Sequence, residues 1–335
     1  MTTVRVLQTI GLDDSEKAFV EIRSGYPQNT YYTCAGNVDL ASVLKPLEDV
    51  ELETMLCGIA EPQLAEVPAA DVILNAVCDA DSNTGALACV AAVQRQLGLP
   101  VVNAPDRVLR TTRDGICRLL EGQPGVVVPT TVRIQPRYRA DVPAMAAAAG
   151  VSVPFLVREV GTHGGTRLTL LEDPERLDEL DRFAFDGGAY YVTQFVDFRS
   201  PDGVYRKYRV IVIDGVPYAR HLVAAKTWKI NATDRGELMD DPRYAQEEEQ
   251  FLRDFKPERY PVFEAMASVL GLDYFGVDYA FDAAGDIVVF EANPCFRVLW
   301  QGTSQSAIPS HVESDGLIRA SMRQLLRRRA GVTDA

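Results

Sequence analysis

Residues 276–294 read GVDYAFDAAGDIVVFEANP, and this pattern predicts two β-strands joined by a tight turn. In the first strand, apolar side chains at 277, 279 and 281 alternate with polar or small ones, which is the period of a strand with two different faces. Gly285 lies in the turn, where it can take the positive φ that hairpin turns require. We therefore expect an antiparallel hairpin.

In the returning strand, Val289, Glu291 and Asn293 are spaced two residues apart and should share one face. Folding the hairpin about its turn brings Asp278 opposite Glu291, with Cβ atoms roughly 4.5–5.5 Å apart. Two carboxylates that close would repel each other, and a hard divalent cation such as Mg²⁺ would remove the conflict. On spacing alone, a solvated polar sheet face explains the pattern equally well, so the rest of the chain has to decide.

The composition is that of a soluble globular protein with room for two or three compact units. The 335 residues are 47% hydrophobic and 24% charged. A formal net charge of −13 argues against nucleic acid as a partner, and no apolar run is long enough to predict a membrane protein. Six scattered cysteines without a CxxC pair, and an N-terminus without a signal-peptide layout, predict a cytoplasmic protein with reduced thiols.

Strand-like and helix-like segments alternate over the first hundred residues, which predicts a three-layer α/β domain. The strand candidates are the segments 4–10, 72–77 and 100–103, and the segment 86–97 favours a helix. The polar run Asp79–Asn83 follows one of these strands, at the edge where such sheets bind ligands. A polar loop that caps the next helix is the simpler explanation of that run.

A separate subdomain should follow a helix that begins at Pro105 and runs to about Glu121. Its antiparallel sheet is predicted from four short segments, 126–134, 154–159, 166–171 and 190–196. Between the second and the third lies GTHGGT, residues 161–166, whose glycines could let backbone N–H groups converge on an anion. Turn chemistry alone explains a glycine-rich hairpin, but Arg158 on the preceding strand would add a cation suited to a phosphate.

Two further predicted strands carry Lys207, Arg209, His221 and Lys226 in an otherwise acidic protein. These side chains could belong to a solvated strand face. They could also form a cationic patch that binds phosphate and carboxylate groups.

Five segments occur in an order that resembles a known family. They are PVVNAPDRVLRTTRDGICRLL (100–120), PFLVREVGTHGGTRL (154–168), YYVTQFVDF (190–198), KYRVIVIDGVPYARHL (207–222), and GLDYFGVDYAFD with IVVFEANP (271–282 and 287–294). Together they resemble the ATP-grasp superfamily, in particular carboxylate–amine ligases of the glutathione synthetase, D-alanine–D-alanine ligase and ribosomal-protein glutamate ligase type. The resemblance implies an N-terminal three-layer α/β domain (1–104), a central lid-like α+β subdomain (105–196) and a C-terminal α+β subdomain (197–335), the last two clamping ATP.

The resemblance also implies roles for individual residues. Asp278, Glu291 and Asn293 would be the metal ligands, and Arg209 and His221 the catalytic residues. The nucleotide would be held by Arg113, Arg158, His163, Gly164, Gly165, Thr166, Gln194, Phe195, Val196, Lys207 and Lys226. Two departures concern the phosphate contacts, because Arg158 and Gly115 stand where relatives often have lysine. Arg113, on the same helix as Gly115, would supply the missing charge.

The implied activity is an ATP- and Mg²⁺-dependent ligase, in which Mn²⁺ could replace Mg²⁺. It would activate a carboxylate as an acyl phosphate for attack by an amine, and form an amide or peptide bond on a small molecule or peptide. The alternatives are a kinase on the same scaffold and a nucleotide-binding regulator without turnover. A homodimer is compatible with the sequence, which does not fix the oligomeric state.

Overall fold

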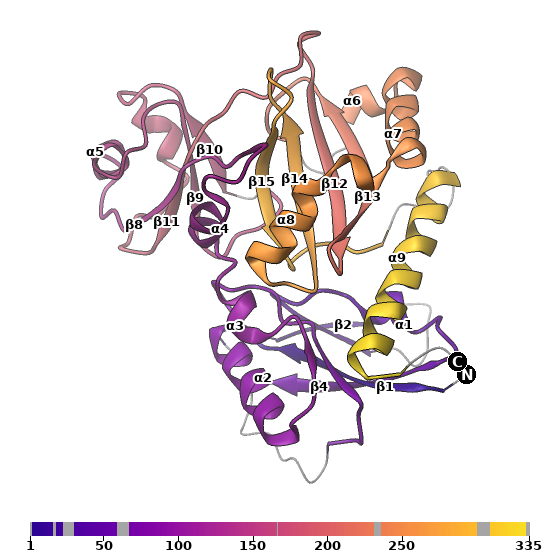
Figure 1. Ribbon diagram of the computed structural model, residues 1–335. Helices are drawn as coiled ribbons and strands as arrows, with labels where there is room; N and C mark the ends of the chain where they lie inside the picture. Colours follow the sequence, from indigo (N-terminus) through magenta and orange to yellow (C-terminus); the bar gives the residue numbers. More distant parts are fainter. Residues whose placement is uncertain are drawn as a thin grey trace.

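The computed structural model describes residues 2–15, 18–22, 30–58, 67–165, 167–230, 236–299 and 309–332. Figure 1 shows three units: an N-terminal unit at the bottom, a small unit with strands β8 to β11 at the left, and a larger unit with strands β12 to β15. The predicted mixed α/β fold class is confirmed. No helix in the described ranges is long and apolar enough to cross a membrane.

The N-terminal unit is built on a parallel four-stranded sheet of order β4-β1-β5-β6. Its strands are β1 (Val4–Gly11), β4 (Val50–Cys57), β5 (Val72–Asn75) and β6 (Val101–Val102). Strand β5 is buried along its whole length, as expected of an apolar strand inside a parallel sheet. Strand β4 was not predicted, because its sequence VELETMLC alternates as an edge strand and forms no apolar run. An antiparallel pair, β2 (Ala18–Ile22) and β3 (Thr30–Cys34), accompanies the sheet.

Helices cover both faces of this sheet. Helix α2 (Thr84–Leu97) packs on one face of the sheet, and α1 (Ala41–Leu44) packs on the other face. The C-terminal helix α9 (Pro309–Arg329) also packs on that other face, so the end of the chain returns to its beginning (Figure 1). Arg323 and Arg327 of α9 both bind the Asp49 carboxylate, at 2.6 and 2.9 Å, and fix this contact. The third layer therefore comes partly from the far end of the sequence.

The small unit contains an antiparallel sheet of order β10-β9-β11-β8. Its elements are β8 (Thr131–Ile134), α5 (Asp141–Ala148), β9 (Phe155–Glu159), β10 (Leu168–Leu171), a 3-10 helix η2 (Leu177–Leu180) and β11 (Tyr190–Gln194). Two predictions that lead into this unit are wrong in detail. The helix expected from Pro105 to Glu121 is split into α3 (Pro105–Val108) and α4 (Arg113–Leu120), because the Thr112 hydroxyl accepts the Gly115 N–H and starts a new helix. The strand expected over 126–134 is split into β8 and β7 (Val126–Val127), and β7 pairs with the larger sheet.

The larger unit is a five-stranded sheet of order β13-β12-β14-β15-β7. Its elements are β12 (Tyr205–Ile213), β13 (Val216–Ala225), α6 (Gly236–Met239), α7 (Pro242–Asp254), η3 (Pro257–Arg259), α8 (Pro261–Leu270), β14 (Tyr274–Phe281) and β15 (Ile287–Asn293). Strands β14 and β15 form the predicted hairpin, and the Asp282 carboxylate accepts two backbone N–H groups in its turn. The domain boundaries at 104/105 and 196/197 stay a prediction.

Candidate active site

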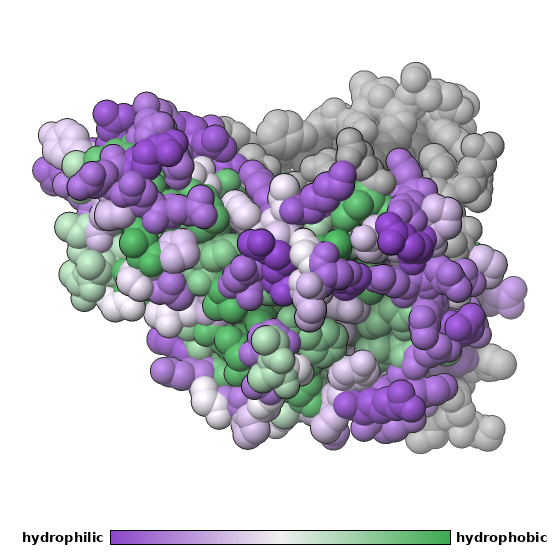
Figure 2. Space-filling model, turned by 90° about the horizontal axis from the view of Figure 1, so that it is seen from above, coloured by the Kyte–Doolittle hydropathy of each residue, from purple (hydrophilic) through white to green (hydrophobic). Residues whose placement is uncertain are grey.

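A cavity of about 980 Å³ opens where the three units meet. All but two of the predicted site residues line it, namely Arg113, Arg158, His163, Gly164, Gly165, Gln194, Phe195, Val196, Lys207, Arg209, His221, Asp278, Glu291 and Asn293. Thr166 lies outside the described residues. Lys226 is exposed just beyond β13 and is not part of the wall, whereas Lys229, which was not predicted, is. From above, Figure 2 shows apolar side chains near the middle of the molecule, with hydrophilic ones around them.

Four polar residues form a row across neighbouring strands of the larger sheet. His221 on β13 pairs with Arg209 on β12, and Arg209 pairs with Asp278 on β14. Asp278 in turn pairs with Glu291 on β15, so the predicted cross-strand neighbours are confirmed. The sheet therefore holds an imidazole, a guanidinium and two carboxylates side by side at the cavity.

A β-bulge lies beside each end of this row. The extra residue is Arg220 in β13 and Phe290 in β15, as the shifts in register show. The second bulge corrects one prediction, because Val289 pairs with Tyr279 and packs in the same hydrophobic cluster. Val289 therefore does not share the face of Glu291.

Asp278 is held as a carboxylate by two cations. The Arg209 guanidinium makes two hydrogen bonds to it, one of them 2.7 Å long, and the Lys207 ammonium lies at 3.2 Å. Burial alone would raise the pKa of Asp278, but the charges of Arg209 and Lys207 outweigh it and hold that pKa well below its usual range.

Glu291 is ionised for a similar reason. Burial would raise its pKa, but Arg113, whose Nη2 lies 2.8 Å from Oε1, lowers it. The Asn293 amide also donates to Oε1, at 2.9 Å, while the Asn293 Oδ1 accepts the backbone N–H of Cys295. Asp278 and Glu291 are therefore both negative at neutral pH.

This set of oxygen atoms fits Mg²⁺. Two ionised carboxylates and an amide oxygen, which keeps a second lone pair, are ligands that a hard cation accepts. Within the described ranges, no three histidine, cysteine, aspartate or glutamate side chains are grouped as a complete metal site. Asp278, Glu291 and Asn293 would supply only part of the coordination shell, as the protein ligands of Mg²⁺ do in sites that phosphate oxygens complete.

Arg158 and Arg113 bring positive charge to the cavity beside Glu291. Arg158 on β9 is almost fully buried, and burial together with the charge of Arg113 lowers its pKa to about 9. Among the described residues, its Nε has no hydrogen-bond partner. A buried guanidinium in this state is stabilised by an anion in the cavity.

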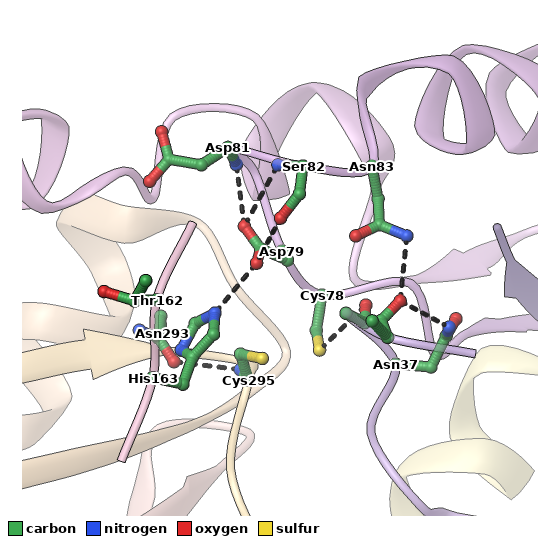
Figure 3. Close-up of polar contacts among 12 residues, drawn as sticks. Asn37, Cys78, Asp79, Asp81, Ser82, Asn83, Thr162, His163, Asn293 and Cys295 are labelled. Atoms are coloured by element: carbon green, nitrogen blue, oxygen red, sulfur yellow. Dashed lines mark hydrogen bonds and ion pairs between the residues drawn. The ribbon is translucent and has the colours of Figure 1, made fainter. Parts of the chain in front are cut away.

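The glycine-rich connection reaches across to the N-terminal unit. Gly164 and Gly165 both have positive φ, at 64° and 73°. Between them and β9, the His163 Nε2 lies 2.8 Å from the Asp79 carboxylate (Figure 3). The His163 Nδ1 lies 4.0 Å from Glu291. The hydrogen bond to Asp79 raises the pKa of His163 to about 9, although burial opposes it. This side chain is therefore a cation at neutral pH.

His221 is in a different state. Burial, with the nearby Arg209 charge, lowers its pKa well below the usual value, so its imidazole is neutral. Its Nε2 is buried and has no hydrogen-bond partner within the described residues, and the residue lines the cavity. It can accept or donate a hydrogen bond but carries no charge.

The predicted hinge Gln194–Val196 also lines the cavity, with one qualification. The Gln194 side chain binds the backbone of Ser152 and Pro154 at 2.9–3.1 Å and so fixes the chain entering β9. Phe195 packs edge-on against Trp228, with ring centroids 6.0 Å apart. An aromatic wall of this kind suits a flat ring, while the Gln194 side chain has a structural role.

The loop Asp79–Asn83 serves contacts within the protein. Asp79 accepts from Ser82 and His163, and Asn83 donates to backbone carbonyls of the N-terminal unit (Figure 3). Asp81 accepts the Tyr191 hydroxyl at 2.8 Å and the Arg133 guanidinium at 2.7 Å, a contact between units that sequence reasoning missed. Because these partners are far apart in sequence, no local pattern marks them.

The fold is shared with solved structures of ligases. VanG D-Ala:D-Ser ligase from Enterococcus faecalis matches with a TM-score of 0.57 and 13% identity, over 98% of this chain and 100% of that one. D-alanine–D-alanine ligase from Bacillus anthracis complexed with ATP matches with 0.54 and 13%, over 99% and 100%. The ADP complex of purK, N5-carboxyaminoimidazole ribonucleotide synthetase, matches with 0.57 and 14%, over 99% and 78%. No family model and no curated protein matches this sequence.

Proposed function

The chain has the ATP-grasp fold found in carboxylate–amine ligases, and we propose that it is such a ligase. It would use ATP and Mg²⁺ to activate a carboxylate as an acyl phosphate, which an amine then attacks to form an amide or peptide bond with release of ADP and phosphate. The observation that carries the proposal is the row His221–Arg209–Asp278–Glu291 at the cavity wall. Two of the compared structures, which hold ATP or ADP, support a nucleotide in the cavity.

Asp278, Glu291 and Asn293 would hold Mg²⁺, which would neutralise phosphate charge when bound. Arg209 and Lys207 lie on the Asp278 side of the row and would stabilise the negative charge that develops on the transferred phosphoryl group. Arg158 and Arg113 would bind the other phosphates. Most of the catalysis would then be positioning and charge stabilisation, so no nucleophilic side chain is needed.

The glycine-rich connection would cover the reacting phosphate. Backbone N–H groups of Gly164 and Gly165 are suited to phosphate oxygens, and the His163 cation adds charge beside them. With His163 bonded to Asp79, this segment lies against the N-terminal unit and would limit the access of water. Exclusion of water matters because an acyl phosphate hydrolyses readily.

Product analysis tests the proposal. The protein is incubated with Mg²⁺ and ATP, together with amino acids and short peptides that are blocked at the amine (carboxylate donors) or at the carboxylate (amine donors), and each donor is also tested alone. ADP and phosphate that appear only when both a carboxylate and an amine are present support the ligase. A phosphorylated product that is stable without an amine would favour the kinase, and release of AMP would exclude the acyl phosphate route.

A further inference from the structure

Two thiols face each other at the junction between the N-terminal unit and the larger sheet. Cys78 follows β5, and Cys295 follows β15. Both line a small polar cavity of about 20 Å³, which also touches His163 and Glu291. The two side chains interact directly, and Figure 3 shows their sulfur atoms turned toward one another. They are 217 positions apart in the sequence, from 78 to 295, so only the fold brings them together.

The two thiols differ in access. Cys295 also lines the large cavity and is only partly buried, so it is the more accessible of the two cysteines. Cys78 is only 2% exposed, is absent from that wall, and donates its S–H to the Gly36 carbonyl at 3.2 Å. An accessible cysteine beside a protected one is the arrangement of a reactive thiol with a resolving partner.

We propose that Cys295 and Cys78 form an oxidant-sensitive dithiol that reacts with hydroperoxides. The Cys295 sulfur attacks the O–O bond of the hydroperoxide, which leaves a sulfenic acid on Cys295 and releases water or an alcohol. The Cys78 sulfur then attacks the sulfenic sulfur, forms the S–S bond and releases water. In total the two thiols lose two protons and two electrons, which reduce the hydroperoxide.

The disulfide would add a covalent bond at the junction of the N-terminal unit and the larger sheet. It would tie the segment after β5 to the segment after β15, two residues beyond Asn293. Because β15 also carries Glu291, the bond would restrict the strand that lines the cavity. Loss of ligase activity on oxidation is the one consequence that rests on the proposed function.

A second cysteine pair supplies a matched control. Cys57, at the end of β4, and Cys89, on α2, also interact directly, but both belong to the N-terminal unit. A bond between them would leave the junction of the units unchanged. The response of the protein can therefore be assigned to one pair or the other by single substitutions.

The experiment maps disulfides in the full chain without nucleotide. The reduced protein is treated with hydrogen peroxide, free thiols are blocked with an alkylating reagent, and the peptides are analysed by mass spectrometry. We expect a cross-linked peptide pair that contains Cys78 and Cys295, its loss after reduction, and a corresponding loss of Cys78 alkylation. In Cys78→Ser the cross-link disappears and Cys295 proceeds to sulfinic or sulfonic acid, whereas Cys57→Ser keeps the cross-link.

The proposal fails if Cys78 is alkylated in full after peroxide treatment of the wild-type protein, or if Cys295 is overoxidised there without a cross-link. This result needs no variant, so misfolding of Cys78→Ser cannot hide it. It also needs no catalysis. If the cross-link forms in a protein that releases no ADP in the product analysis, the proposed ligase function is overturned, whereas the proposal of an oxidant-sensitive dithiol stands.

Discussion

The charge of His163 can be measured directly, because the chain has only three histidines. The hydrogen bond to Asp79 raises the pKa of His163 from 6.5 to about 9, against the effect of burial. Asp79→Asn removes the negative charge and keeps the size of the side chain. We therefore expect the pKa of His163 to fall back toward 6.5 in this variant.

The contribution of the His163–Asp79 interaction to the free energy of unfolding has a defined sign and size. Because the folded-state pKa is raised, the stabilisation is fully present below about pH 6.5 and is lost as the pH rises through about 9. At about 1.4 kcal/mol per pH unit, the difference between 6.5 and about 9 corresponds to at most about 3.5 kcal/mol. The His163 side chain is 41% exposed, so solvent screening reduces this to about 1 kcal/mol.

The assay is an NMR titration of the imidazole C–H signals in protein without Mg²⁺ or nucleotide. Loss of one signal in His163→Gln assigns that signal to His163. His221 is an internal comparison, because its pKa is lowered and its imidazole should stay neutral over the pH range of the titration. Urea unfolding at pH 6 and pH 10 measures the change in the free energy of unfolding with pH, and Asp79→Asn is the control in which this part of the change should be absent. A wild-type His163 that titrates near 6.5, or one that does not respond to Asp79→Asn, would refute the reasoning.

Three substitutions test other parts of the structure. Glu291→Ala should abolish turnover, a loss beyond about a thousandfold, with the circular dichroism spectrum retained. Tyr191→Phe removes the hydroxyl that donates to Asp81 and should lower the free energy of unfolding by about 1–3 kcal/mol, measured with urea. Gly276→Ala places a Cβ 2.8 Å from the Phe296 ring and should cost about 1–3 kcal/mol in the same measurement.

Each substitution has an outcome that contradicts its premise. Glu247→Ala is the control for Glu291→Ala, because Glu247 binds Arg206 away from the cavity, and equal losses in both variants would remove the metal assignment. Unchanged stability of Tyr191→Phe would show that Arg133 alone satisfies Asp81. Unchanged stability of Gly276→Ala would mean that the Phe296 ring moves aside at no cost.

The hairpin could be predicted from sequence because its information is local. Alternation and a glycine turn predict the two strands and their pairing. The register next to the turn, with Phe281 opposite Ile287, would place Phe290 opposite Asp278, and the bulge brings Glu291 there instead. The bulge at Phe290 could not be predicted, since one extra residue leaves no mark in a strand of apolar side chains. That is why Val289 was placed on the wrong face.

Contacts between the units could not be predicted from the sequence for another reason. The pairs His163–Asp79 and Arg133–Asp81 join residues that are 84 and 52 positions apart. Taken alone, each of these residues looks like an ordinary polar residue of a loop or of a solvent-exposed strand. The resemblance to a family brought His163 into the site but gave no partner for it. Lys226 was predicted from the strand pattern, whereas Lys229, which lines the cavity, lies beyond the end of β13.

The two bulges bear on how such a site can evolve. Each adds a residue, Arg220 or Phe290, and the resulting shift in register is what pairs His221 with Arg209 and Glu291 with Asp278. Both added side chains line the cavity. Substitutions at these two positions can therefore alter which molecules fit, while the cross-strand order of imidazole, guanidinium and carboxylates persists. Drift in substrate preference would start there, at insertions that the sheet already tolerates.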